Sequence, residues 1–133
     1  MKIIKGATVV VADGEKLVLF TVTDVEGPTL VALDAPDVSG DNKSGGSRHH
    51  SSSTNPDDSR LEEDSYVVAI VEWLNHRAMA GKFASVIVVA PPKALGEMRK
   101  HYHKSLVAVL DGELAKDLTG HSAADIAKSL AAH

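Results

Sequence analysis

Residues 85–92 read Ser-Val-Ile-Val-Val-Ala-Pro-Pro, and this stretch decides the fold class. Val86 to Ala90 is a continuous apolar run, without the polar alternation of a strand that faces water on one side. The two prolines end the run, and Pro92 suits the first turn of a helix. A short strand buried on both faces and followed at once by a helix is typical of an α/β protein. We therefore predict the central strand of such a sheet at Ser85–Ala90.

Three further strands are predicted before residue 35, as an antiparallel meander. Asp13-Gly14 separates two β-rich runs, Thr8–Ala12 and Lys16–Val22. Asp-Gly in this position predicts a hairpin with a type I′ turn, in which both central residues have positive φ. Gly27-Pro28 marks the next turn, and Thr29–Leu33 is the third strand.

Leu61–Ala80 is predicted to be a long helix. Ser59 and Glu62 match a capping box at its start, and Gly81 stands where a C-terminal cap belongs. Its apolar residues recur at helical spacing and are expected to face the core. They are Tyr66, Val67, Ile70, Val71, Leu74 and Ala78.

The C-terminal part predicts a second and a third helix. The apolar face of the second comprises Leu95, Met98 and Tyr102. Leu106–Leu110 fits either a fifth strand or a helical continuation, and the periodicity leaves both open. Ser122 caps a final short helix whose apolar residues include Ile126 and Leu130. The order predicts a single α/β domain over residues 1–133, with a mixed sheet and about three helices.

Composition excludes several classes of protein. The 133 residues are 44% hydrophobic and 24% charged, which is typical of a globular domain, and no apolar run is long enough to span a membrane. There is no cysteine, so disulfides and thiolate metal sites are excluded. The N-terminus does not resemble a signal peptide, so we expect a cytoplasmic protein with no membrane partner. His101 and His103 would point to different faces of a helix, and we expect neither a metal nor a cofactor.

A long polar segment separates the meander from the first helix. Residues 35–60 have no hydrophobic periodicity, and we predict a mobile insertion there. Gly45 and Gly46 would let backbone amides approach a phosphate, and Arg48 would supply a cationic donor. The alternative is a solvated flexible loop without a ligand.

The second helix carries a basic face. Its cationic side chains are Lys93, Arg99, Lys100, His103 and Lys104. Because the helix begins at the carboxyl end of the buried strand, where ligands of α/β sheets bind, these side chains are candidates for binding phosphates of RNA or a nucleotide. The alternative is an ordinary solvated helix face.

Several segments resemble the bacterial host attachment family, named for proteins required for attachment to host cells. They are Val11–Lys16, Ala80–Phe83, Val88–Lys100 and Asp117–Thr119, with His121 nearby. This family is similar to the middle domain of archaeal and eukaryotic peptide-chain release factors and is grouped with bacterial release-factor-like proteins. The resemblance implies a mixed-sheet domain related to the ribonuclease-H-like architecture and a role near the ribosome or transfer RNA.

Release factors promote peptidyl-tRNA hydrolysis through a Gly-Gly-Gln loop. In this chain Gly45-Gly46 is followed by Ser47, and the sequence contains no glutamine. The resemblance therefore transfers no catalytic residue. We expect a binding module for tRNA or the ribosome. One alternative is a hydrolase of peptidyl-tRNA or another phosphate-bearing ester, using Ser47, His49 or His50. Another is a module that binds a protein partner, or a second copy, through an exposed sheet edge. The oligomeric state is left open.

Overall fold

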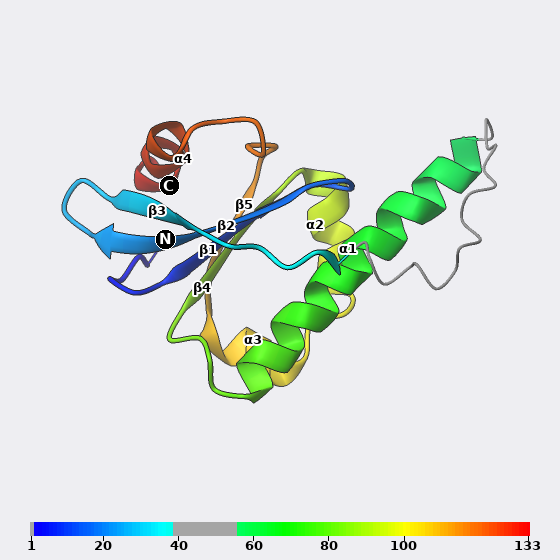
Figure 1. Ribbon diagram of the computed structural model, residues 1–133, viewed down its shortest axis with the longest axis horizontal. Coiled ribbons are helices and arrows are strands. Elements are labelled where there is room, and N and C mark those ends of the chain that lie inside the picture. Colours follow the sequence, from blue (N-terminus) through cyan, green and yellow to red (C-terminus); the bar gives the residue numbers. More distant parts are fainter. Residues whose placement is uncertain (1, 39–55) are drawn as a thin grey trace.

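The structure is a computed structural model that describes residues 2–38 and 56–133, with the side chains of residues 56–60 excepted. In this part of the chain, one five-stranded sheet is covered by helices on both faces (Figure 1). The expected α/β class with a mixed sheet is confirmed. No helix of the described residues has the length and apolar character needed to cross a membrane.

The sheet joins the N-terminal meander to two parallel strands. Its strands are β1 (Thr8–Ala12), β2 (Leu17–Asp24), β3 (Thr29–Leu33), β4 (Val86–Ala90) and β5 (Leu110–Ala115). Their order across the sheet is β3-β2-β1-β4-β5. β2 pairs antiparallel with β1 and β3, while β4 pairs parallel with β1 and β5. Of these five strands, β2 alone runs against the others.

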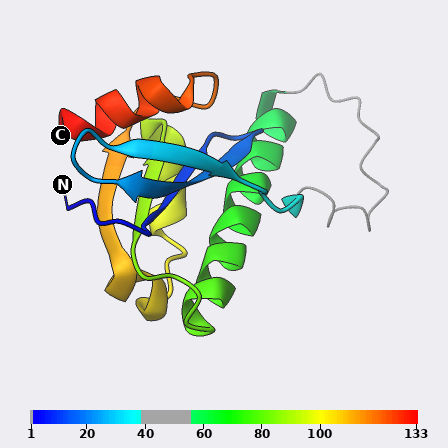
Figure 2. The same cartoon turned by 60° about the vertical axis from the view of Figure 1, so that its left-hand side comes forward.

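The helices lie in two layers. They are α1 (Pro56–Met79), α2 (Pro92–Arg99), α3 (Lys104–Val109) and α4 (Ala123–Ala131). α1, α2 and α3 pack on one face of the sheet, and α4 packs on the other (Figure 2). The described residues thus hold four helices where about three were predicted.

β4 is buried on both faces, as its sequence predicted. Its even-numbered residues Val86, Val88 and Ala90 belong to the core under α1 and α2. Its odd-numbered residues Ile87 and Val89 belong to the core under α4. All five have no exposed surface, because side chains of a strand alternate between the two faces.

The hairpin after β1 is confirmed, but its predicted turn type is wrong. Among the described residues, positive φ occurs only at Gly6, Gly27 and Gly81, so neither residue of Asp13-Gly14 adopts it. Instead, Asp13 Oδ1 accepts hydrogen bonds from the backbone N–H groups of Glu15 and Lys16, at 2.7 and 2.6 Å. A side-chain acceptor closes the turn, which removes the need for the left-handed conformation.

α1 has the predicted buried face, but it begins at Pro56 and not at Leu61. Val67, Ile70, Val71 and Leu74 are buried, and Tyr66 and Ala78 pack beside them. Its C-terminal end is the predicted glycine cap. Gly81 has φ of 72°, and the N–H of Lys82 donates to the carbonyl of Arg77 at 3.0 Å. This is the bond pattern of a Schellman motif.

The second predicted helix is broken in two. α2 ends at Arg99, and Tyr102 lies in the link to α3. Leu106–Leu110, left open between helix and strand, is helical up to Val109, and β5 begins at Leu110. The predicted cap of α4 is confirmed, because Ser122 Oγ accepts from the N–H of Asp125 at 3.1 Å.

Candidate nucleic-acid interface

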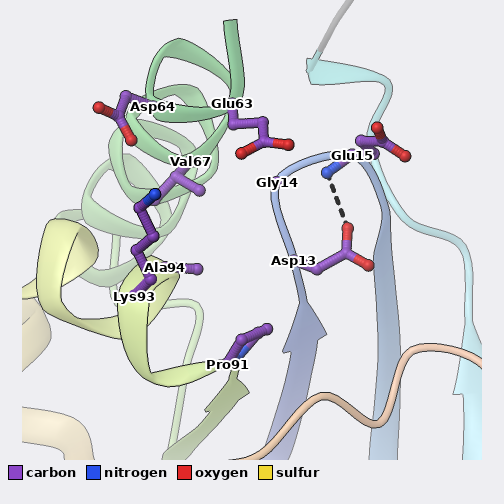
Figure 3. A pocket seen from close by; sticks show the side chains of 9 residues that line it. All are labelled: Asp13, Gly14, Glu15, Glu63, Asp64, Val67, Pro91, Lys93 and Ala94. Carbon is purple, nitrogen blue, oxygen red and sulfur yellow. Dashed lines mark hydrogen bonds between the residues drawn. The ribbon is translucent and has the colours of Figure 1, made fainter. Parts of the chain in front are cut away.

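The carboxyl ends of β1 and β4 lie side by side at the same end of the sheet, because these strands are parallel neighbours. The turn after β1 and the start of α2 therefore face each other, and the N-terminal half of α1 lies beside them. A cleft of about 330 Å³ lies between these elements (Figure 3). Its lining residues are Asp13, Gly14, Glu15, Glu63, Asp64, Val67, Pro91, Lys93 and Ala94. No local pattern in the sequence indicates this cleft, because its two sides are far apart in the chain.

The charge in this cleft is mostly negative, with four carboxylates and one ammonium group. Gly14 lies so close to α1 that a Cβ there would be 2.8 Å from Cγ of Glu63. Among the described residues, no three His, Cys, Asp or Glu side chains are grouped so that they could hold a metal ion. The interior of the cleft thus repels phosphate.

The opposite side of the cleft is the N-terminus of α2, which favours anions. Pro91 occupies the cap position and provides no side-chain hydrogen bond to the helix, and Pro92 has no N–H. The first helical bond is donated by Leu95 to the carbonyl of Pro91, at 2.8 Å. The N–H groups of Lys93 and Ala94 therefore have no partner within the helix. Together with the exposed Lys93 side chain, they provide positive charge at this end of α2.

A second cleft of about 450 Å³ continues along α2. Its lining includes Lys93, Glu97 and Lys100, so the structure brings two of the predicted basic residues to one side of the helix. Glu97 lies between them in the chain. Its Oε1 accepts from Lys100 Nζ at 3.1 Å, and its Oε2 lies 3.2 Å from His101 Nε2. Hydrogen bonds from Lys100 and His101 lower the pKa of Glu97, so this carboxylate offsets one of the two lysines.

Arg99 is directed towards the sheet and lies on a different side of α2. Its Nε and Nη2 donate to Oε1 of Glu113 on β5, at 3.0 and 2.7 Å. The Tyr102 hydroxyl donates to Oε2 of the same carboxylate at 2.7 Å. The hydrogen bond with Glu113 raises the pKa of Arg99, and burial raises that of Tyr102. Arg99 thus joins α2 to β5, a structural contact that the sequence did not predict.

His103 and Lys104 lie beyond the end of α2, so the single basic helix face that was predicted is wrong. His103 caps α3, because its Nδ1 accepts from the N–H of Ser105 at 3.0 Å. Lys104 is exposed in the first turn of α3, with no ion-pair partner among the described side chains. Asn75 on α1 holds the link in place, since it donates to the carbonyl of His101 and accepts from the N–H of His103.

Comparison with known families identifies the domain. The chain matches the family described as bacterial archaeo-eukaryotic release factor family 12 over residues 6–130. The chain belongs to this family. A comparison with curated proteins finds no match.

The match to release factor family 12 begins before β1 and ends at residue 130, one residue before the end of α4. Both clefts and all the basic residues named above therefore lie within the family's domain. The predicted loop residues Gly45, Gly46 and Arg48, together with Ser47, His49 and His50, lie outside the described residues. The release-factor part of the predicted resemblance is thus confirmed at the level of the family.

Proposed function

We propose that this domain is a binding module for RNA of the translation machinery, tRNA or ribosomal RNA. Its membership of a release-factor-like family over residues 6–130 carries the proposal. The structure supports it with the uncapped N-terminus of α2 and the exposed side chains of Lys93, Lys100 and Lys104. Lysines and free helix N–H groups bind phosphates without reading sequence.

The charges of the two clefts favour one path for the RNA backbone. Four carboxylates in the first cleft would repel a phosphate from its interior. The second cleft has two lysines against Asp64 and Glu97, and it lies beside the positive end of α2. The phosphates are therefore expected to follow the outer side of α2, from Lys93 towards Lys100.

We include in the proposed RNA contact the residues of the polar segment that the sequence predicted to bind phosphate. Gly45, Gly46 and Arg48 would add backbone and guanidinium contacts to the RNA. Hydrolysis of peptidyl-tRNA is the alternative, and it would depend on Ser47, His49 or His50. A further alternative is a module that binds protein. We also propose that the chain belongs with the host attachment proteins, on its match at Val88–Lys100, and that it acts in the cytoplasm.

The test is binding of the full chain to tRNA and to ribosomes at about 50 and about 200 mM salt. The variant Lys93→Ala/Lys104→Ala is expected to weaken binding about tenfold at the lower salt and to reduce its salt dependence. The control is Lys5→Ala/Lys128→Ala, which removes the same charge from exposed positions before β1 and on α4. Absence of binding at about 50 mM salt, or equal losses in both variants, would contradict the proposal.

A further inference from the structure

β3 forms one edge of the sheet, with no strand beyond it among the described residues (Figure 2). Of its five residues, only Leu30 is buried. Val31 and Leu33 are 48% and 42% exposed, although both are large and apolar. An apolar edge strand is a template on which another strand can pair.

The hydrogen bonds of β2 show which backbone groups of β3 are not bonded to β2. The N–H of Val22 donates to the carbonyl of Ala7, and its carbonyl accepts from Gly6, so Val22 bonds on the side of β1. Since bonding direction alternates along a strand, Thr21 and Leu19 bond on the side of β3. Their partners there are Val31 and Leu33. The N–H and carbonyl groups of the intervening residues, Leu30 and Ala32, therefore point away from the sheet.

The two edges of the sheet differ in how they are protected. β5, at the opposite edge, contains Asp111 and Glu113. Charged side chains of this kind discourage pairing with another strand. β3 reads Thr-Leu-Val-Ala-Leu and contains neither a charge nor a proline. α4 packs against β3 on the face that buries Leu30. Among the described residues, the outward backbone groups along the edge of β3 are thus open to pairing, whereas the edge formed by β5 carries charged side chains.

The charge around β3 indicates the kind of strand that fits. From Leu17 to Val38 the sequence has four carboxylates and no Lys, Arg or His. Asp24 and Glu26 precede β3, and Asp34 follows it directly. In an antiparallel pair of two β3 strands, Asp34 of one copy would lie beside the acidic turn of the other. Like charges at both ends disfavour a second copy and favour a strand with cationic ends.

We propose that β3 binds an extended segment of another protein, one with apolar residues at alternate positions and Lys or Arg at both ends. The outward groups of Leu30 and Ala32 would form the backbone hydrogen bonds, and Val31 and Leu33 would contact the apolar side chains. Strand addition of this type gives affinity through the backbone and selectivity through alternate side chains. This surface is separate from the proposed RNA contact on α2.

The test uses two synthetic peptides with one core, Lys-Lys-Thr-Val-Thr-Val-Thr-Lys-Lys and Glu-Glu-Thr-Val-Thr-Val-Thr-Glu-Glu. The lysine peptide is expected to bind the full chain about tenfold more tightly at low salt, because three exposed carboxylates lie at the ends of β3. In the free protein, the amide protons of Leu30 and Ala32 should exchange quickly while those of Val31 and Leu33 exchange slowly. The lysine peptide should slow the exchange at Leu30 and Ala32.

Two variants separate the backbone contribution from the charge. Ala32→Pro removes an outward N–H and no bond to β2, so it should abolish peptide binding in a chain that still folds. Glu26→Gln/Asp34→Asn should keep the fold and make the two peptides bind about equally. Failure of the lysine peptide to bind would overturn the proposal, as would unchanged binding by Ala32→Pro. Slow exchange at Leu30 and Ala32 in the free monomer would also overturn the proposal, and so would dimerisation that Ala32→Pro abolishes. Either result would mean that the edge of β3 is already occupied.

Discussion

The hydroxyl of Thr119 donates to Oδ2 of Asp13 at 2.9 Å, across 106 positions of the chain. The other oxygen of Asp13 accepts from two backbone N–H groups of its own turn. This one carboxylate therefore closes the β1–β2 turn and attaches to it the segment that follows β5. Asp13 lines the first cleft, but its oxygens are occupied by structural bonds, so we interpret it as an anchor and not as a reactive acid.

Replacing Asp13 tests this anchor. Asp13→Ala is expected to lower the free energy of unfolding by about 2 kcal/mol, because three hydrogen bonds to an ionised acceptor are lost at a partly exposed site. Thr119→Val removes the bond to Oδ2 of Asp13, together with the weaker contact of the same hydroxyl to Oδ1 of Asp117 at 3.1 Å. It leaves the two turn bonds of Asp13 intact and should cost less than about 1 kcal/mol. Urea denaturation followed by circular dichroism measures both. Equal losses in the two variants would show that the turn bonds of Asp13 contribute nothing.

Protonation of Glu113 is expected to lower the stability of the fold in acid. Burial by itself raises the pKa of Glu113, but hydrogen bonds from Arg99 and Tyr102 outweigh it, and the pKa lies below the ordinary value of 4.5. A carboxyl with a lowered pKa stabilises the fold above its unfolded-state pKa, and this contribution disappears as the pH falls through the folded-state value. Glu113→Gln should therefore be less stable than the parent chain at neutral pH, by about 1 kcal/mol, and the difference should shrink below pH 4.5. A constant difference between pH 3 and 7 would contradict this account.

The raised pKa values of Tyr66 and Tyr102 are expected to make the fold less stable in alkali. Burial raises the pKa of Tyr102 far above its ordinary value of 10.0, with the bond to Glu113 as a further cause. Burial and the charges of Asp13 and Asp37 also raise the pKa of Tyr66, by less. A raised pKa stabilises the fold below the unfolded-state value, and this stability is lost as the pH rises above about 10. Tyr102→Phe should therefore remove more of the alkaline decline than Tyr66→Phe does, as measured by urea denaturation at pH 9 and 11. The reverse order would contradict the assignment.

The sequence predicted those elements whose signals are local. The apolar run of β4, the helical spacing from Val67 to Leu74, and the caps at Gly81 and Ser122 are each decided by residues within one or two turns. All of them are confirmed. The chain order of these elements was enough to predict the α/β class.

The remaining features depend on contacts between distant residues. The break after Arg99 is held by Asn75, which lies 26 and 28 positions from its two partners and has no periodic signal. Arg99 belongs to the basic set by composition, yet Glu113 directs it towards the sheet. The first cleft is lined by residues of the β1–β2 turn, α1 and α2. These elements are far apart in the chain, so no local sequence pattern could reveal the cleft.

Replacement of glycine by alanine is expected to have opposite effects on stability at Gly81 and at Gly96. Gly81 has φ of 72° and open space around its Cα, so Gly81→Ala should cost about 1 kcal/mol through backbone strain alone. Gly96 lies within α2 with open space and no positive φ. Gly96→Ala should stabilise the chain by up to about 1 kcal/mol, because alanine restricts the unfolded chain. Thermal unfolding of both variants tests the signs, and destabilisation by Gly96→Ala would show that α2 is strained at that position.

If the domain binds RNA as proposed, removing the charge of Glu97 should increase its affinity for RNA. Its carboxylate neutralises Lys100 at 3.1 Å and faces His101 at 3.2 Å, within the cleft along which phosphates are expected. Glu97→Gln removes the negative charge that faces Lys100 and His101, and with it a negative charge on the RNA path. The variant should bind tRNA about threefold more tightly at low salt, with a steeper salt dependence. The control is Glu72→Gln, the same change at an exposed position of α1, which should leave affinity nearly unchanged. Filter binding at two salt concentrations distinguishes them. Equal gains in both variants would mean that only net charge matters, and a loss in Glu97→Gln would exclude α2 from the RNA contact.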